Sequence, residues 1–246
     1  MRYLIGIDDT DNQFTRGTGF RTRDLTKLLH QHKLGNVYAI SRHQLYVHPE
    51  IPYTSHNSSA CLDIKTDNIE QLKAFSTDYL KRESAEGSDV GLCIAPYQAV
   101  TERIVNWGHR AKKEILYQEE AYSIAKEENI YLEGFLGTKG GIIGALAGVG
   151  LRKYGNDGRF FWLSGKELRE FNGIYKCSEL LEASIFDQII SSNGQIIGPN
   201  DLIFVNEWLR PVMNNFKISV IVEPSLNEPE YEWRIASKEY IKSISD

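Results

Sequence analysis

Residues 2–12 read RYLIGIDDTDN, an apolar run that ends in a cluster of carboxylates. Residues 2–7 are apolar at most positions, a pattern that predicts a short strand buried on both faces. Three carboxylates, Asp8, Asp9 and Asp11, come directly after this strand. Because ligands tend to bind in the crevice beyond the ends of sheet strands, we expect this acidic loop to form a functional site.

The acidic loop is typical of cation binding. Aspartates at alternate positions can converge on one hard cation, and Mg²⁺ commonly takes one or two carboxylates together with phosphate oxygens. Without a cation, like charges about 4 Å apart repel by about 4 kcal/mol at an effective dielectric near 20. The loop therefore predicts metal or nucleotide chemistry with Asp8, Asp9 and Asp11 as metal ligands. A solvated acidic turn that caps a helix is the alternative.

A second motif places Thr18 between Gly17 and Gly19, at the predicted start of a helix over residues 18–32. Backbone N–H groups lack partners at a helix start, and the dipole there is positive, so this geometry binds anions. Thr18 is a phosphate contact, a phosphoryl acceptor or a helix cap. The residues alone leave these three roles open.

A third motif is the glycine-rich turn at residues 137–141, which carries Lys139, Gly140 and Gly141 and opens an apolar helix to about residue 153. Glycines let the backbone approach phosphate closely, and a lysine supplies a point charge. The pattern differs from the P-loop, which requires G-x-x-x-x-G-K-[ST]. Gly144 and Gly148 lie four residues apart, and such small residues also indicate close helix packing.

Polar side chains gather around a proline-bounded turn within residues 41–60. Arg42, Tyr53 and Asn57 are the candidate substrate-binding residues of this segment, because together they can form a polar pocket wall. Its three histidines lack the close spacing of a zinc site, so we assign them no metal.

Composition sets the class of protein. The 246 residues carry a net charge of −5, but residues 1–60 hold a surplus of +2 while residues 160–246 hold −5. Nucleic-acid binders usually show a basic surplus, so a basic face is expected only in the first part of the chain. Three widely spaced cysteines exclude a four-cysteine zinc ribbon and a disulfide framework. The absence of a signal peptide or a long apolar run indicates a cytoplasmic protein without membrane partners.

The remaining pattern predicts an α+β protein, with a mixed sheet in a kinase-like domain and a smaller β-rich part at the C-terminus. A turn cluster at residues 155–158 sets the expected boundary between a nucleotide-binding region, 1–157, and a C-terminal region, 158–246. Further elements are expected at the following ranges: strands over 37–47, 60–64, 90–94, 130–135, 159–163, 194–197, 202–205, 218–222 and 231–235, and helices over 69–81, 97–115 and 118–128.

Four motifs in order resemble one known family. They are I-G-I-D-D-T-D, the glycine–threonine segment, R-x-x-L-x-x-x-P-x-I-P-Y and K-x-G-x-I-G-A-L-A, which run from residue 1 to about residue 151. This set is similar to the archaeal tRNA(Ile) 2-agmatinylcytidine synthetase family. That family combines a kinase-like domain with a ferredoxin-like domain, an OB-fold and a zinc ribbon. It uses ATP and Mg²⁺ to activate a cytidine carbonyl for attack by agmatine.

The resemblance implies a role for individual residues. Asp8, Asp9 and Asp11 match the acidic loop expected to bind Mg²⁺ and ATP phosphates, with Asp8 and Asp9 also catalytic. Thr18 falls on the family's autophosphorylated threonine. Lys139 and Gly141 fall in the turn near the nucleotide.

Departures from the family indicate a different substrate. Asn57 matches the asparagine after the I-P-Y segment, but a lysine and an arginine of the family are replaced in residues 54–56. No cysteines match the zinc ribbon, and residues 158–246 stand at the ferredoxin-like position without matching it by motif.

Three function classes are compatible with these motifs. The leading prediction is an ATP- and Mg²⁺-dependent phosphotransferase or ligase related to the synthetase, acting on a nucleotide and on an unknown small-molecule or nucleic-acid substrate. The alternative is a non-catalytic nucleotide- or nucleic-acid-binding module on the same fold. A third class is a phosphohydrolase with an aspartate nucleophile, because Asp9-x-Asp11 resembles the haloacid-dehalogenase motif. Gln13 stands where that motif has Thr or Val.

Overall fold

The structure is a computed structural model that describes residues 1–54, 56–165, 167–226 and 228–246. It divides into two compact units, residues 1–154 and 155–246, and each is described by itself. The α+β class with a mixed sheet is confirmed. No helix within the described ranges is long and apolar enough to cross a membrane.

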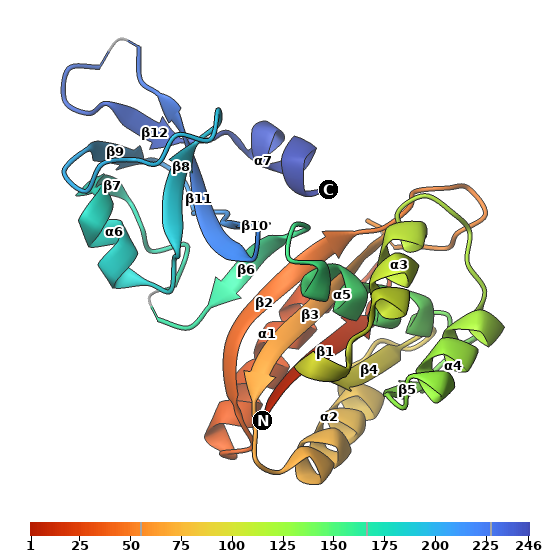
Figure 1. The fold of residues 1–246 in the computed structure, drawn as a ribbon. Coiled ribbons are helices and arrows are strands. Elements are labelled where there is room, and N and C mark those ends of the chain that lie inside the picture. The colour runs from red at the N-terminus through yellow and green to blue at the C-terminus, as the bar shows by residue number, and fades with distance from the viewer. Residues whose placement is uncertain (55, 166, 227) are drawn as a thin grey trace. The chain divides into compact units, whose positions relative to one another are not determined.

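The first unit is one sheet with helices on both faces (Figure 1). Its strand order is β5-β4-β1-β3-β2, and every pairing within it is antiparallel. The strands are β1 (Arg2–Asp8), β2 (Asn36–Gln44), β3 (Ser58–Lys65), β4 (Gly91–Pro96) and β5 (Tyr131–Gly134). The helices are α1 (Thr18–Gln31), α2 (Ile69–Glu83), α3 (Glu102–Ala111), α4 (Gln118–Glu127) and α5 (Ile142–Tyr154).

Strand β1 is the centre of this sheet, and its sequence explains why. Alternate side chains of a strand point to opposite faces, so a strand that is apolar throughout is covered on both sides. Leu4 packs into the cluster formed with α3, α4 and α5. Ile5 and Ile7 are fully buried and point to the opposite face, which α1 and α2 cover.

Helix α5 lies unusually close to the sheet, and glycine permits it. A Cβ added to Gly6 of β1 would lie 1.9 Å from the carbonyl oxygen of Ala145, and one added to Gly148 would lie 2.5 Å from Ser59 Oγ. Real Cβ atoms do not approach other atoms so closely. The packing interpretation of the small residues of α5 is therefore confirmed at Gly148.

The second unit is a smaller, mixed sheet. Its strand order is β6-β10-β11-β12-β9-β7, and β8 also pairs with β11. The parallel pairs are β8 with β11 and β9 with β12. Its elements are β6 (Arg159–Leu163), β7 (Gly173–Lys176), α6 (Cys177–Ala183), β8 (Gln188–Ser191), β9 (Leu202–Val205), β10 (Val212–Asn214), β11 (Lys217–Pro224), β12 (Trp233–Ile235) and α7 (Lys238–Ser245).

Several sequence predictions need correction. The helix expected over 97–115 is a single 3₁₀ turn, Tyr97–Ala99, followed by the shorter α3. The strand expected over 194–197 is absent there; the segment makes only an isolated bridge between Ile196 and Ile190. The missed elements, β7, α6, β8, β10 and α7, are short, and three to eight residues carry too little periodic signal for a sequence pattern.

Candidate functional site

Asp8 is the last residue of β1 and lies beside the first turn of α5. A Cβ added to Gly144 would lie 1.7 Å from Asp8 Oδ2, so only glycine fits beside this carboxylate. The backbone N–H of Asp9 donates to Asp8 Oδ1 at 2.9 Å. A helix N-terminus favours negative charge, so α5 is suitably placed to support an anion here.

A fourth carboxylate, which the sequence prediction missed, joins the acidic loop. Asp89 stands just before β4, and the antiparallel pairing of β4 with β1, in which Asp8 faces Gly91, places it next to Asp9. Asp9 itself adopts a left-handed backbone with φ of 53°. Such conformations are uncommon outside glycine and cluster at functional sites.

Burial and neighbouring negative charges oppose the ionisation of Asp8 and Asp9. Burial, followed by the neighbouring charges of Asp9 and Asp11, raises the pKa of Asp8 well above its usual value. Burial and the charges of Asp89 and Asp11 raise the pKa of Asp9 to about 6. The folded chain therefore concentrates negative charge that a bound cation would stabilise.

Asp11 and Thr18 form a hydrogen-bonded pair at the start of α1. Asp11 Oδ1 accepts hydrogen bonds from the backbone N–H and from the hydroxyl of Thr18, both at 3.0 Å. Asp11 is thus the side-chain cap of α1, whereas Gly17 occupies the N-cap position without a capping side chain. Thr18 Oγ1 also accepts from the N–H and hydroxyl of Thr10, each at 3.2 Å. A hydroxyl that donates a hydrogen bond to a carboxylate has the arrangement of a nucleophile beside its general base.

The glycine turn at 137–141 is organised by Asp89. The N–H of Thr138 donates to the Asp89 carboxylate, and the N–H of Gly141 donates to the Asp89 carbonyl oxygen at 2.7 Å. A Cβ added to Gly137 would lie 2.0 Å from Asp89 Oδ1, whereas Gly140 has no close neighbour. At least two N–H groups of the turn are therefore already bonded within the protein. This differs from the open phosphate cradle that its sequence suggested.

Lys139 has a left-handed backbone with φ of 66° and an exposed side chain. The start of that side chain lies over Gly134 of β5. The described contacts include none between Lys139 and Thr18. Their two loops are connected through three carboxylates instead: Asp11 binds Thr18, Asp9 interacts with the charges of Asp11 and Asp89, and Asp89 binds the glycine turn. A phosphate site shared by Thr18 and Lys139 thus stays a prediction.

The predicted substrate residues lie on or after β2. Asn57 donates from Nδ2 to the carbonyl oxygen of Tyr46 at 2.6 Å. Arg42 donates to Ser58 Oγ at 3.1 Å and to Gln44 Oε1 at 2.9 Å. Both side chains are thus engaged in ordering the β2–β3 connection.

The same connection reaches the acidic loop. The hydroxyl of Thr54 donates to the carbonyl oxygen of Asp11 at 3.4 Å. Its neighbour Tyr53 is 46% exposed. The connection therefore contacts the backbone of the acidic loop through Thr54, and Ser55 of this segment lies outside the described residues.

The donors present fit magnesium in a limited role. Among the residues that the structure describes, no three His, Cys, Asp or Glu side chains form a ready metal site. Asp11 already uses one oxygen on Thr18. Mg²⁺ bound with polyphosphate needs only one or two protein carboxylates, and the mutually repelling Asp8 and Asp9 fit that smaller role.

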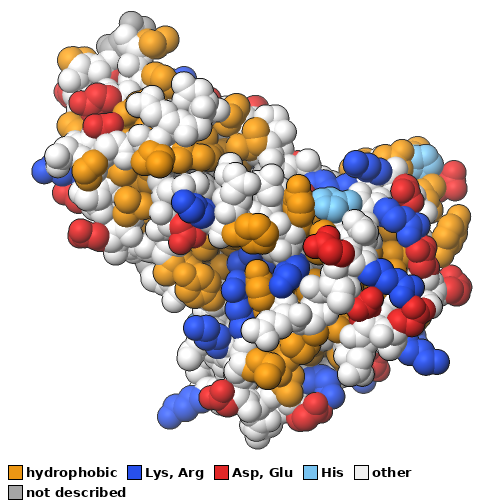
Figure 2. Space-filling model, viewed as in Figure 1, with side chains coloured by type: hydrophobic (Ala, Val, Ile, Leu, Met, Phe, Trp, Pro, Cys, Tyr) orange, Lys and Arg blue, Asp and Glu red, His pale blue; other side chains and the backbone are white. Residues whose placement is uncertain are grey.

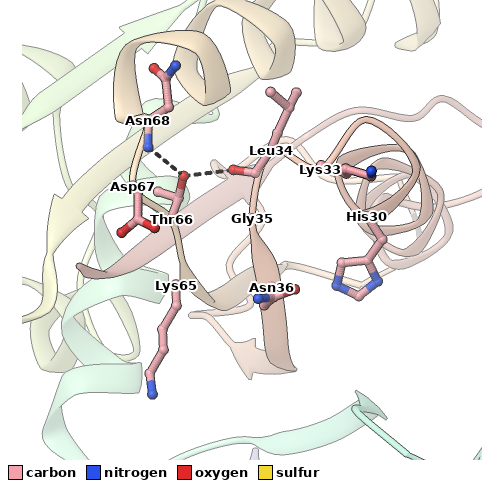
Figure 3. A pocket seen from close by; sticks show the side chains of 9 residues that line it. All are labelled: His30, Lys33, Leu34, Gly35, Asn36, Lys65, Thr66, Asp67 and Asn68. Carbon is pink, nitrogen blue, oxygen red and sulfur yellow. Dashed lines mark hydrogen bonds between the residues drawn. The ribbon is translucent and has the colours of Figure 1, made fainter.

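A pocket of about 300 Å³ lies at the other end of the sheet (Figure 3). His30 and Lys33 approach it from the end of α1, and Lys65 to Asn68 from the end of β3. Thr66 joins the two walls, because its hydroxyl donates to the carbonyl oxygen of Leu34 at 2.7 Å and accepts from the N–H of Asn68 at 3.1 Å. The pocket shares no residue with the acidic loop.

The fold and this site define an α+β protein with a carboxylate-rich loop beside a glycine turn. No protein-family model and no curated protein matches the chain. Solved structures do match. A tRNA fluorescent labeling enzyme is 25% identical over 61% of this chain and 36% of its own, with a TM-score of 0.54.

Further matches include structures of TiaS, a tRNAIle2 agmatidine synthetase. Its complex with this tRNA and ATP is 24% identical over 61% of this chain and 36% of its own, with a TM-score of 0.55. Its complex with the tRNA, AMPCPP and agmatine is 16% identical over 99% of this chain and 55% of its own, with a TM-score of 0.54. The resemblance predicted from the motifs is confirmed at the level of the fold. The chain spans about a third to a half of the length of these proteins.

Proposed function

We propose that the chain is an ATP- and Mg²⁺-dependent phosphotransferase or ligase-type enzyme, related to the tRNA agmatidine synthetase but with a different substrate. The observation that carries the proposal is the meeting of Asp8, Asp9 and Asp89 beside the first turn of α5. Burial, together with neighbouring carboxylates, raises the pKa of Asp8 and of Asp9, so their negative charge is costly in the free protein. A cation bound together with a polyphosphate would neutralise this negative charge, and the relief of the electrostatic cost would favour binding.

In this proposal Asp8 and Asp9 hold the metal, which supplies charge neutralisation on the phosphates. Thr18 is the acceptor and Asp11 is its base. The Thr18 oxygen attacks the γ-phosphorus, its proton moves to Asp11 Oδ1, and the bond to the bridging oxygen breaks to release ADP. The 3.0 Å bond between the Thr18 hydroxyl and Asp11 supports this assignment. Lys139 is proposed to neutralise charge that develops on the transferred group.

The substrate class comes from the matched structures. Because TiaS has been solved with its tRNA and ATP, we propose that this chain acts on a nucleotide and on an RNA or RNA-derived substrate. The replaced basic residues of the 54–56 segment favour a substrate other than the same tRNA. We propose the cytoplasm as the compartment of this function.

The non-catalytic alternative has one specific observation in its favour. The Asp89 contacts to Thr138 and Gly141 close the glycine turn, which leaves fewer N–H groups for a transition state. A binding module would tolerate such a turn, whereas a phosphotransferase would need other donors.

Thermal unfolding with ATP and Mg²⁺ tests the proposal. A ligand at 100 times its Kd stabilises the folded state by about 2.7 kcal/mol, an easily measured shift. We expect this shift in the wild type and its loss in Asp9→Asn. A shift without any nucleotide product would favour the non-catalytic module, and equal ATP affinity in wild type and Asp9→Asn would remove the acidic loop from the function.

A further inference from the structure

At the end of the sheet far from the acidic loop, two cations gather around one aromatic ring. The guanidinium carbon of Arg2 lies 3.9 Å from the centre of the Tyr97 ring, and Lys153 Nζ lies 3.8 Å from it. Lys153 Nζ also donates to the Tyr97 carbonyl oxygen at 2.9 Å. Tyr97 therefore fixes two positive charges in place, one from the start of β1 and one from the end of α5.

One carboxylate, Asp63, forms ion pairs with two arginines, of which Arg2 lies next to Tyr97. Asp63 is buried and accepts from Arg2 Nε at 2.8 Å and Arg2 Nη2 at 2.5 Å. It also accepts from Arg152 Nη2 at 2.7 Å. Two arginines thus share a single buried aspartate. Burial, and then the charge of Arg2, lowers the pKa of Lys153, and the charge of Glu102 opposes this effect.

The positive charge continues along the strand ends. Lys65 of β3 is the cross-strand partner of Arg2, and its exposed side chain also lines the pocket of Figure 3. Tyr38 of β2 is 44% exposed and lies close enough to raise the pKa of Arg2. We call Arg2, Tyr38, Lys65, Tyr97 and Lys153 the basic strip. Figure 2 shows Lys and Arg side chains interleaved with hydrophobic ones on the face of the first unit that carries α5.

We propose that the basic strip binds the phosphate backbone of an RNA, with Tyr38 as a stacking surface for a base. Lys153 has three ammonium hydrogens and uses one on Tyr97, so two remain for phosphate oxygens. Cations alternating with exposed aromatic rings are the usual surface for single-stranded nucleic acid. The inference deepens the proposed function, because it assigns RNA a place on the chain.

Separation from the acidic loop supports this placement. From Arg2 to Asp8, β1 rises about 3.3 Å per residue, which puts the strip about 20 Å from the carboxylates. Phosphates bound at the strip therefore avoid the repulsion of Asp8, Asp9, Asp11 and Asp89, while one molecule of RNA is long enough to reach both sites.

Fluorescence anisotropy with a labelled 12-nucleotide single-stranded RNA tests the proposal, with titrations at several salt concentrations and without ATP. For single strands, each lost phosphate contact reduces the salt slope of log K by about 0.7. The double variant Lys65→Gln/Lys153→Gln should therefore lower the slope by about 1.4 and the affinity on the order of ten-fold at about 0.1 M salt. Tyr38→Leu should weaken binding to this RNA more than to a 12-base-pair RNA duplex.

The control is Lys27→Gln/Lys126→Gln, which removes the same charge from exposed positions of α1 and α4. An unchanged affinity and slope in the strip variant, or an equal loss in the control, would overturn the proposal. So would complete displacement of the RNA by millimolar inorganic phosphate at constant ionic strength. Asp9→Asn should bind the RNA like the wild type, so failure of the nucleotide function and failure of the strip are distinguished.

Discussion

Replacing Asp9 by asparagine should stabilise the free protein while abolishing its response to ATP. The pKa of Asp9 rises from its usual 3.8 to about 6, and each unit corresponds to about 1.36 kcal/mol. Ionised Asp9 therefore costs up to about 3 kcal/mol, and partial exposure to solvent reduces this toward about 1 kcal/mol. Asparagine keeps the acceptor oxygen and tolerates the left-handed backbone at this position, so Asp9→Asn removes only the charge.

The effect has a defined pH window. Below about pH 4 Asp9 is protonated in both the folded and the unfolded states, so wild type and variant differ little. As the pH rises from about 4 to 6, the unfolded chain loses this proton first, and the wild type loses stability that the variant keeps. Asp9→Asn should therefore exceed the wild type by about 1 to 3 kcal/mol at about pH 7.5 and by almost nothing at about pH 3.5.

Hydrogen exchange of the β1 and β4 amides measures this difference within the first unit. Asp78→Asn is the matched control, because it removes an exposed carboxylate from α2 and should change stability by less than about 0.5 kcal/mol. A variant less stable than wild type at the higher pH, or a gain that is equal at both pH values, would refute the electrostatic account of the loop.

The contacts support three further predictions. Gly144→Ala should lower the free energy of unfolding in urea by more than about 3 kcal/mol, because the added Cβ would lie 1.7 Å from Asp8 Oδ2. Gly140→Ala, where the nearest atom is 3.5 Å away, should lower it by less than about 1 kcal/mol. Similar losses in the two variants would contradict the close-packing argument. Asp63→Asn should destabilise by about 3–5 kcal/mol in the same assay, since it leaves two arginines around a neutral amide. With γ-labelled ATP, Thr18→Val should abolish protein labelling that Thr18→Ser retains, and Lys139→Ala should slow labelling more than it weakens ATP binding; label in Thr18→Val would exclude Thr18 as acceptor.

The first unit was largely predictable because its signals are local. The apolar run of residues 2–7, the acidic residues after it and the glycine turn before α5 each depend on a few neighbouring residues, and the strand β1 and the helix α5 that they predict are present. The short strands after residue 160 were harder, because their pairings join segments far apart in the chain.

The sequence predicted most residues of the site but not the contacts between them. Asp89 has no motif of its own, and only the antiparallel pairing of β4 with β1 brings it to Asp9. Knowledge of that pairing would have supplied the missing signal. The left-handed backbones of Asp9 and Lys139 and the occupied N–H groups of the glycine turn depend on tertiary contacts, which sequence patterns do not encode.

The position of β1 has a consequence for how the chain is made. Its two sheet neighbours are β3 and β4, and α5, which closes over it, begins about 130 residues after β1 ends. At about 5–20 residues per second, a ribosome needs roughly 7 to 26 s to supply that helix. During this time Leu4, which packs against α3, α4 and α5, lacks its permanent cover, whereas Ile5 and Ile7 face α1 and α2, which are made earlier. The nascent chain therefore exposes the Leu4 face of β1 long after the opposite face can be covered, and this face is where chaperones or aggregation would act first.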